Sequence, residues 1–177
     1  MKRAITIFLL IIIFLIIYLL QSNLFSWFNI AGVRPNLFVV FILIIGLFLG
    51  ESKGITLGII LGIVLDFFIS KSVGISGIMF AVIGIIGGVL DKNFSKDSRI
   101  TMIIMIVMCT CLYEIGSYIF NYFVNDANIE ILIFTKKLII ENLFNIILTI
   151  ILYPIIIKLG YKSEKVYRED KILTRYF

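Results

Sequence analysis

Histidine is missing from the 177-residue chain, and cysteine occurs only twice. The absence of histidine removes the side chain that most often shuttles protons and binds metal ions near neutral pH. Cys109 and Cys111 are two positions apart inside an apolar run, so on a helix they point to nearly opposite sides. We therefore predict neither a disulfide nor a metal site, and no cofactor.

Without histidine, no serine or cysteine of the chain has the usual catalytic base. Paired carboxylates could do acid–base chemistry only where water and substrate reach them. We therefore expect no catalytic residue and a protein that is not an enzyme.

Charged residues are also scarce, at 15% of the chain against 61% hydrophobic residues. A soluble globule of this size needs more polar surface than this composition provides. Lipid cannot hydrogen-bond the backbone, and long apolar runs favour helices over a barrel of alternating strands. The composition therefore predicts an all-α integral membrane protein.

Six apolar runs approach the roughly 20 residues that cross a bilayer as a helix. The second and third runs could form one helix, but Glu51 and Lys53 would then lie mid-membrane at about 2.5 to 3.5 kcal/mol each. A tight hairpin turning at ESKG is therefore predicted between them. The first run is longer than the core of a signal peptide and no cleavage pattern follows it, so we expect an uncleaved span. The six runs are 4–20, 36–49, 55–69, 75–90, 100–123 and 138–157.

These runs predict a six-transmembrane-helix bundle over residues 1–160, followed by a basic cytoplasmic tail over 161–177 that is a short helix or disordered. With the N-terminus inside, twelve lysines and arginines fall in cytoplasmic segments and four in outer ones. The positive-inside rule then places both termini in the cytoplasm. The positive charge follows from topology, and we expect no nucleic-acid partner.

The segment between the first two spans holds the only tryptophan, Trp27, flanked by Phe25 and Phe28. Such an aromatic group is typical of the membrane–water interface, here the outer one. Pro35 is expected in the first turn of the second span, where its missing N–H is harmless. The basic tail is expected to lie near anionic lipid, with docking to a cytoplasmic partner as the alternative.

Three carboxylates fall inside predicted spans, all in the outer half of the membrane. Polar residues at helical spacing accompany Glu114 on the fifth span and Glu141 on the sixth, so each forms a polar stripe. Because polar groups avoid lipid, we expect the stripes to meet Asp66 around an outer polar depression. The candidate polar or partner site is Asp66, Glu114, Tyr118, Asn121, Glu141, Asn142 and Asn145.

No lysine or arginine lies within a predicted span to neutralise these carboxylates. We therefore expect at least one of them to be protonated at pH 7, or to pair with a basic residue of another chain. The alternative is that the polar stripes are interhelical hydrogen-bond contacts that only hold the bundle together.

Glycines recur every fourth residue in GITLGIILGIVLD (54–66), which ends in Asp66. A step of four overshoots one helical turn by about 40°, so the row is slanted. Small residues at this spacing allow close helix packing, within the chain or with a partner helix. The candidate packing residues are Gly54, Gly58, Gly62, Gly84 and Gly88.

The order of these pieces resembles the family of the rod shape-determining protein MreD. The resemblance lies in GVRPNLFVVFILIIG followed by GITLGIILGIVLDFFISKSVGISGIMFAVIG, and is clearest from about Gly32 to Gly88. A Pro-Asn pair opens the second span, and a glycine-spaced third span ends in an acidic residue with a glycine beyond it. The family-motif positions are Pro35, Asn36, Asp66 and Gly74.

The resemblance implies a non-enzymatic membrane subunit of the bacterial elongation machinery. Its expected partners are the bitopic protein MreC and, indirectly, the MreB filament, the glycosyltransferase RodA and its transpeptidase. The outer polar surface and the glycine ridge are the expected contacts for MreC. The resemblance also implies a fold similar to the substrate-binding subunits of energy-coupling-factor transporters, and the alternative function is such a vitamin-type transporter subunit. Its ligand would lie between Glu114, Asn121, Glu141 and Asn145.

Overall fold

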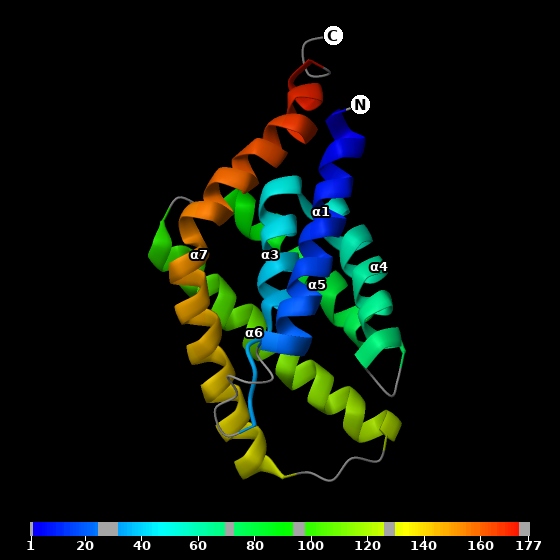
Figure 1. The fold of residues 1–177 in the computed structure, drawn as a ribbon, viewed down its shortest axis with the longest axis vertical. Coiled ribbons are helices and arrows are strands. Elements are labelled where there is room, and N and C mark those ends of the chain that lie inside the picture. The colour runs from blue at the N-terminus through cyan, green and yellow to red at the C-terminus, as the bar shows by residue number, and fades with distance from the viewer. Residues whose placement is uncertain (1, 25–31, 70–72, 94–97, 126–129, 174–177) are drawn as a thin grey trace.

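The computed structural model describes residues 2–24, 32–69, 73–93, 98–125 and 130–173, with side chains over 5–23, 32–68, 73–92, 98–124 and 130–166. Helices dominate this described part, as the composition predicts, and each predicted run lies in a helix of its own (Figure 1). The elements are α1 (Lys2–Leu19), the short π-helix η1 (Leu20–Leu24), α3 (Leu37–Leu49), α4 (Glu51–Ile69), α5 (Ile75–Asn93), α6 (Arg99–Asn125) and α7 (Ile131–Leu173).

Within the described residues, four helices are long and apolar enough to cross a membrane: α1 with η1, α5, α6 and α7. The helix α3 is apolar but has only 13 residues, which is about 20 Å at 1.5 Å per residue. It lies at the centre of the bundle, where nearly all its side chains are buried and it contacts the other five helices. A central helix is shielded from lipid by its neighbours, so its length need not match the bilayer.

The hairpin between α3 and α4 turns one residue earlier than predicted. Gly50 alone makes the turn, with a φ of 88° in the region that favours glycine. ESKG (51–54) is the first turn of α4, so the prediction that the chain turns there is wrong. The same stretch, GESKG (50–54), matches the G-x-S-x-G motif, in which hydrolases hold a nucleophilic serine on a sharp turn between a strand and a helix. Here Ser52 lies on the first turn of α4, which follows another helix, so the stretch does not form that nucleophile turn.

The start of α3 also differs from the prediction. Asn36 is the N-cap, and its side chain accepts a hydrogen bond from the Val39 N–H at 3.4 Å. Pro35 precedes the cap and is buried, so it does not occupy the first helical turn. The Pro-Asn pair therefore ends the preceding segment and starts the helix.

The glycine row of α4 packs directly on α5. A Cβ atom added to Gly54 or Gly58 would lie 2.6 Å from a backbone carbonyl oxygen of α5, that of Gly84 or Phe80. Gly62 meets Gly77 and Ser76 in the same way, and Gly88 meets the backbone of Glu51. The whole row is therefore covered within the chain, and the prediction that this ridge contacts a partner helix is wrong.

The last helix is longer than the predicted sixth span at both ends. It begins at Ile131 and not at 138, and it continues through the predicted tail to Leu173. Its 43 residues correspond to about 65 Å, far more than the roughly 30 Å hydrocarbon core. It bends near Pro154 (Figure 1), as expected where proline removes a backbone donor from a helix interior.

The N-terminal end of α1 and the C-terminal end of α7 lie at the same end of the molecule, and α6 crosses the bundle obliquely (Figure 1). The aromatic group of Phe25, Trp27 and Phe28 lies outside the described residues, so its predicted interfacial position stays a prediction.

Candidate functional site

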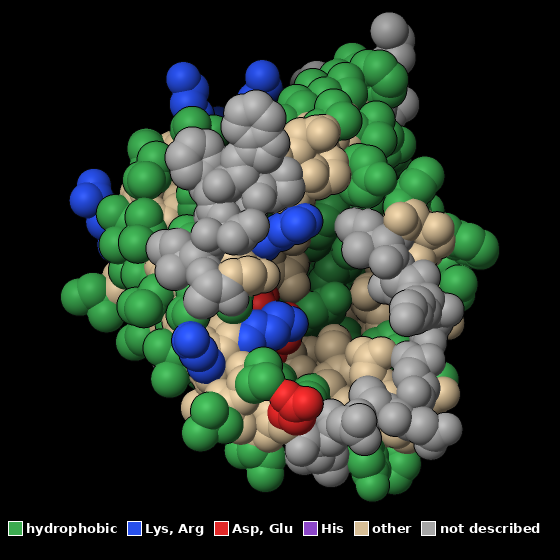
Figure 2. Space-filling model, turned by 60° about the horizontal axis from the view of Figure 1, so that its bottom comes forward, with side chains coloured by type: hydrophobic (Ala, Val, Ile, Leu, Met, Phe, Trp, Pro, Cys, Tyr) green, Lys and Arg blue, Asp and Glu red, His purple; other side chains and the backbone are tan. Residues whose placement is uncertain are grey.

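A polar pocket of about 960 Å³ opens at the end of the bundle opposite the two chain ends. It forms where the segment before α3 and the first turns of α7 face the last turns of α6. Figure 2 shows carboxylates within a hollow that has lysine and arginine side chains around it. The residues that line the pocket include Gln21, Arg34, Pro35, Asn36, Tyr113, Glu114, Ser117, Tyr118, Asn121, Glu130, Ile133, Phe134, Lys136, Lys137 and Glu141.

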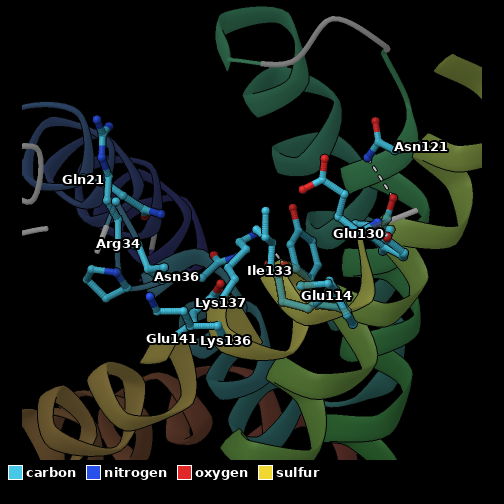
Figure 3. A pocket seen from close by; sticks show the side chains of 17 residues that line it. Gln21, Arg34, Asn36, Glu114, Asn121, Glu130, Ile133, Lys136, Lys137 and Glu141 are labelled. Atoms are coloured by element: carbon cyan, nitrogen blue, oxygen red, sulfur yellow. Dashed lines mark hydrogen bonds and ion pairs between the residues drawn. The ribbon is translucent and has the colours of Figure 1, made fainter. Parts of the chain in front are cut away.

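Two buried carboxylates form the floor of this pocket, Glu114 from α6 and Glu141 from α7 (Figure 3). Lys137 Nζ donates to Glu114 Oε2 at 2.5 Å, and its own side chain is about half exposed. The carboxylate of Glu114 is thus neutralised from within the chain. The expectation that no lysine or arginine of the chain neutralises these carboxylates is therefore wrong for Glu114, because Lys137 lies on a helical turn that had been assigned to a loop. That at least one of the three carboxylates is protonated or pairs with another chain stays a prediction.

Glu141 is only 2% exposed, and its Oε1 atom has no hydrogen-bond partner among the described residues. Glu114 and Lys137 are the charged groups that act on this carboxyl. Ser117, which also lines the pocket, has a buried hydroxyl oxygen that is likewise unpartnered in the described part of the chain. Since buried polar groups in proteins are nearly always hydrogen-bonded, these two atoms are the positions of the pocket where a ligand or a partner could add a hydrogen bond.

The wall of the pocket joins the end of α6 to the start of α7. The Tyr118 hydroxyl accepts a hydrogen bond from the Glu130 N–H at 2.9 Å, and its ring stacks on Phe134 with centroids 4.3 Å apart. Asn121 lines the same wall and donates its amide to the Ser117 carbonyl at 2.7 Å. The exposed charged residues of the rim include Arg34, Glu130 and Lys136.

Asn142 and Asn145 share the polar stripe of α7 but do not line the pocket. Asn145 is fully buried: its Oδ1 accepts from the Asn36 N–H at 3.0 Å, and its Nδ2 donates to Thr110 Oγ1 at 3.0 Å. Asn142 donates to the Leu138 carbonyl within α7 at 2.9 Å and to Cys111 Sγ of α6 at 3.5 Å. Asn145 thus connects α7 to α6 and to the start of α3, and Asn142 connects α7 to α6, which is the alternative interpretation of the stripes.

Asp66 is also fully buried and does not line the pocket. Its Oδ2 accepts hydrogen bonds from the N–H groups of Gly74 at 2.8 Å and Ser76 at 3.0 Å, at the start of α5. A carboxylate is favoured at this position because the N-terminus of a helix carries a partial positive charge. The structure therefore does not bring Asp66 into one site with Glu114 and Glu141. Ser76 Oγ lies 3.2 Å from the Tyr113 hydroxyl, which connects Asp66 to the pocket wall.

A second cavity, an apolar groove of about 320 Å³, lies between α1, α3 and α7. Its lining is almost entirely aliphatic and aromatic, and it extends from Leu20 and Leu37 down to Gly160 and Ser163. Leu20 and Leu37 are the direct neighbours of Gln21 and Asn36 in the polar pocket. The groove therefore ends where the pocket begins.

A family model for the rod shape-determining protein MreD matches residues 1–162, which cover all the α-helices except the last part of α7. The chain belongs to the MreD family. No curated protein and no solved structure matches it. As an MreD family member with four membrane-length helices, the chain is a multi-pass membrane protein that determines rod shape.

The structure gives each family-motif position of this chain a structural role. Pro35 and Asn36 start α3, while Gly74 has a φ of 108° and gives its N–H to Asp66. The sequence interpretation missed Lys137, although a signal for it exists. Lys137 precedes Glu141 by four residues, so extending the helix by one turn places both side chains on one face.

Proposed function

We propose that this chain is a non-enzymatic inner-membrane subunit of the cell-elongation complex that binds a bitopic, MreC-type protein. In this proposal it supports rod shape and lateral peptidoglycan synthesis, and it acts indirectly with the MreB filament, RodA and its transpeptidase. Membership of the MreD family supports the cell-shape role. The partners and the link to synthesis are the proposed part.

The observation that carries the proposal is the continuity of the apolar groove with the polar pocket. A bitopic protein has one membrane helix followed by an outer segment, so its surface changes from apolar to polar at the membrane boundary. The groove changes in the same way between Leu20 and Gln21 on one side, and between Leu37 and Asn36 on the other. We propose that side chains of the partner helix insert into the groove, and that its outer segment covers the pocket.

The proposed topology has six spans, both termini in the cytoplasm and the polar pocket outside. The common position of the two chain ends (Figure 1) and the excess of basic residues in the segments at that end support it. In this orientation the C-terminal part of α7 extends into the cytoplasm, where its basic residues would meet anionic lipid or a cytoplasmic partner. The similarity to energy-coupling-factor subunits stays a prediction, and no observation favours the transporter alternative.

Affinity purification of the tagged chain from native membranes tests this function. We expect an MreC-type single-pass protein, with or without cell-wall synthases, to be retained by the chain. Cells that lack the gene should lose rod shape and regain it with the wild-type chain. Retention of a transporter ATPase and no single-pass protein would contradict the proposal.

A further inference from the structure

The buried charges on the floor of the pocket do not balance. Glu114 and Glu141 are 5% and 2% exposed, and one ammonium group, that of Lys137, bonds to Glu114. The remaining cations, Arg34 and Lys136, are exposed on the rim, where solvent and salt screen them. The floor is therefore short of one positive charge or one proton, next to the unpartnered Oε1 of Glu141.

We propose that Glu141 binds a cationic side chain, a lysine or an arginine, that the outer segment of the partner inserts into this pocket. The inference rests on the proposed function, because it assigns the contact that the pocket makes with the bitopic protein. Lys137 and Glu114 form one ion pair, and Glu141 forms the second pair with the incoming cation. Ser117 Oγ is the additional acceptor that a multi-donor ammonium or guanidinium group requires.

The lining of the pocket suits a long basic side chain. Two tyrosines, Tyr113 and Tyr118, line it together with Glu114 and Glu141. Lysine and arginine lay their methylene stems along such rings while the charged head continues to a carboxylate, and the ring faces themselves attract cations. A cation in this position satisfies the buried Oε1 atom of Glu141, which has no hydrogen-bond partner among the described residues.

The test compares two isosteric variants, Glu141→Gln and Glu130→Gln. Both carboxylates line the pocket, but Glu141 is buried on the floor and Glu130 is exposed on the rim. Loss of one member of a buried ion pair at an interface weakens binding by at least about tenfold, whereas loss of an exposed rim charge changes it little. Affinity of the purified full chain for the co-purified partner should therefore fall for Glu141→Gln and stay near wild type for Glu130→Gln.

A charge reversal identifies the cation. A photo-crosslinking residue at Ile133, which is exposed and lines the pocket, should capture a partner peptide that contains a lysine or an arginine. Reversing that residue to glutamate should abolish binding, and Glu141→Lys should restore it to within a few-fold. This restoration decides the question even where Glu141→Gln is poorly folded.

Two results would overturn the inference: partner binding by Glu141→Gln equal to wild type, which means that Glu141 holds only a proton, or a captured peptide without a basic residue. These failures differ from failure of the proposed function, in which the wild-type chain itself retains no single-pass protein.

Discussion

Asp66 joins two helices by accepting hydrogen bonds from two backbone N–H groups at the start of α5. An aspartate at the outer end of a glycine row was predicted to belong to a shared polar site. In the structure the carboxylate is instead bound locally, by the N–H of Gly74 eight residues further along the chain. Gly74 also makes the turn before α5, with a positive φ. The sequence shows that a buried carboxylate needs a partner, but backbone donors leave no signal in the sequence.

Replacing Asp66 by alanine should destabilise the fold, because two N–H groups would lose a charged acceptor inside the protein. We expect about 2 to 3 kcal/mol for Asp66→Ala and a smaller loss for Asp66→Asn, which keeps one acceptor oxygen. Thermal unfolding of the detergent-purified protein measures the effect. An unchanged midpoint for Asp66→Ala would contradict the capping role.

The ion pair between Lys137 and Glu114 predicts a non-additive double variant. Lys137→Met should destabilise the protein by about 1.5 to 3 kcal/mol because it leaves the Glu114 carboxylate buried without its cation. Adding Glu114→Gln removes that charge and should recover most of the loss. Thermal midpoints of the two single variants and the double variant test this, and strictly additive losses would show that the pair does not couple.

The contact between α4 and α5 depends on glycines that let two helix backbones touch. The small-residue spacing predicts such packing, and the structure identifies the opposing helix as α5. Helix boundaries were less predictable. The structure begins α7 at Ile131, about two turns before the predicted run at 138. The prediction started the span too late because the charged Lys136 and Lys137 interrupt the apolar run, although both are helical. That difference concealed the ion pair of the pocket, since a lysine assigned to a loop cannot be placed on the face of Glu141.

Gly58→Ala should be costly although it adds only one methyl group. Its Cβ would meet the Phe80 carbonyl oxygen at 2.6 Å, and neither backbone can move without separating α4 from α5. We expect a loss at or above the usual 1 to 3 kcal/mol for overpacking. The matched control is Gly116→Ala, whose new methyl meets only the flexible end of Met79. Equal unfolding midpoints for the two variants would contradict the packing account.

In the molecule as a whole, α3, α4 and α5 pack closely through glycines, whereas an apolar groove remains between α1, α3 and α7. The all-helical class and the positions of six helices follow from lipid as solvent and from the apolar runs. The pocket and the groove do not follow from sequence, because residues far apart in the chain, such as Arg34 and Glu130, line one cavity. Periodicity assigns a residue to a helix face but does not identify the helix that the face meets.

The proposed topology predicts the outcome of reporter fusions. Alkaline phosphatase inserted between residues 126 and 129 should be active, since the described end of α6 and start of α7 lie on the side of the pocket. The same reporter fused after residue 177 should be inactive, and a fluorescent protein there should fluoresce. The opposite pattern would place the polar pocket in the cytoplasm and exclude an outer segment as its occupant.

Site-specific photo-crosslinking in native membranes tests the central claim, that one bitopic partner covers both the groove and the pocket. Crosslinking residues belong at Ile155 in the groove and Ile133 in the pocket, with exposed Ile104 on α6 as the control outside both. We predict that Ile155 captures the membrane helix and Ile133 the outer segment of the same MreC-type protein, while Ile104 captures neither. Capture of that protein only from Ile104, or from neither cavity, would contradict the account.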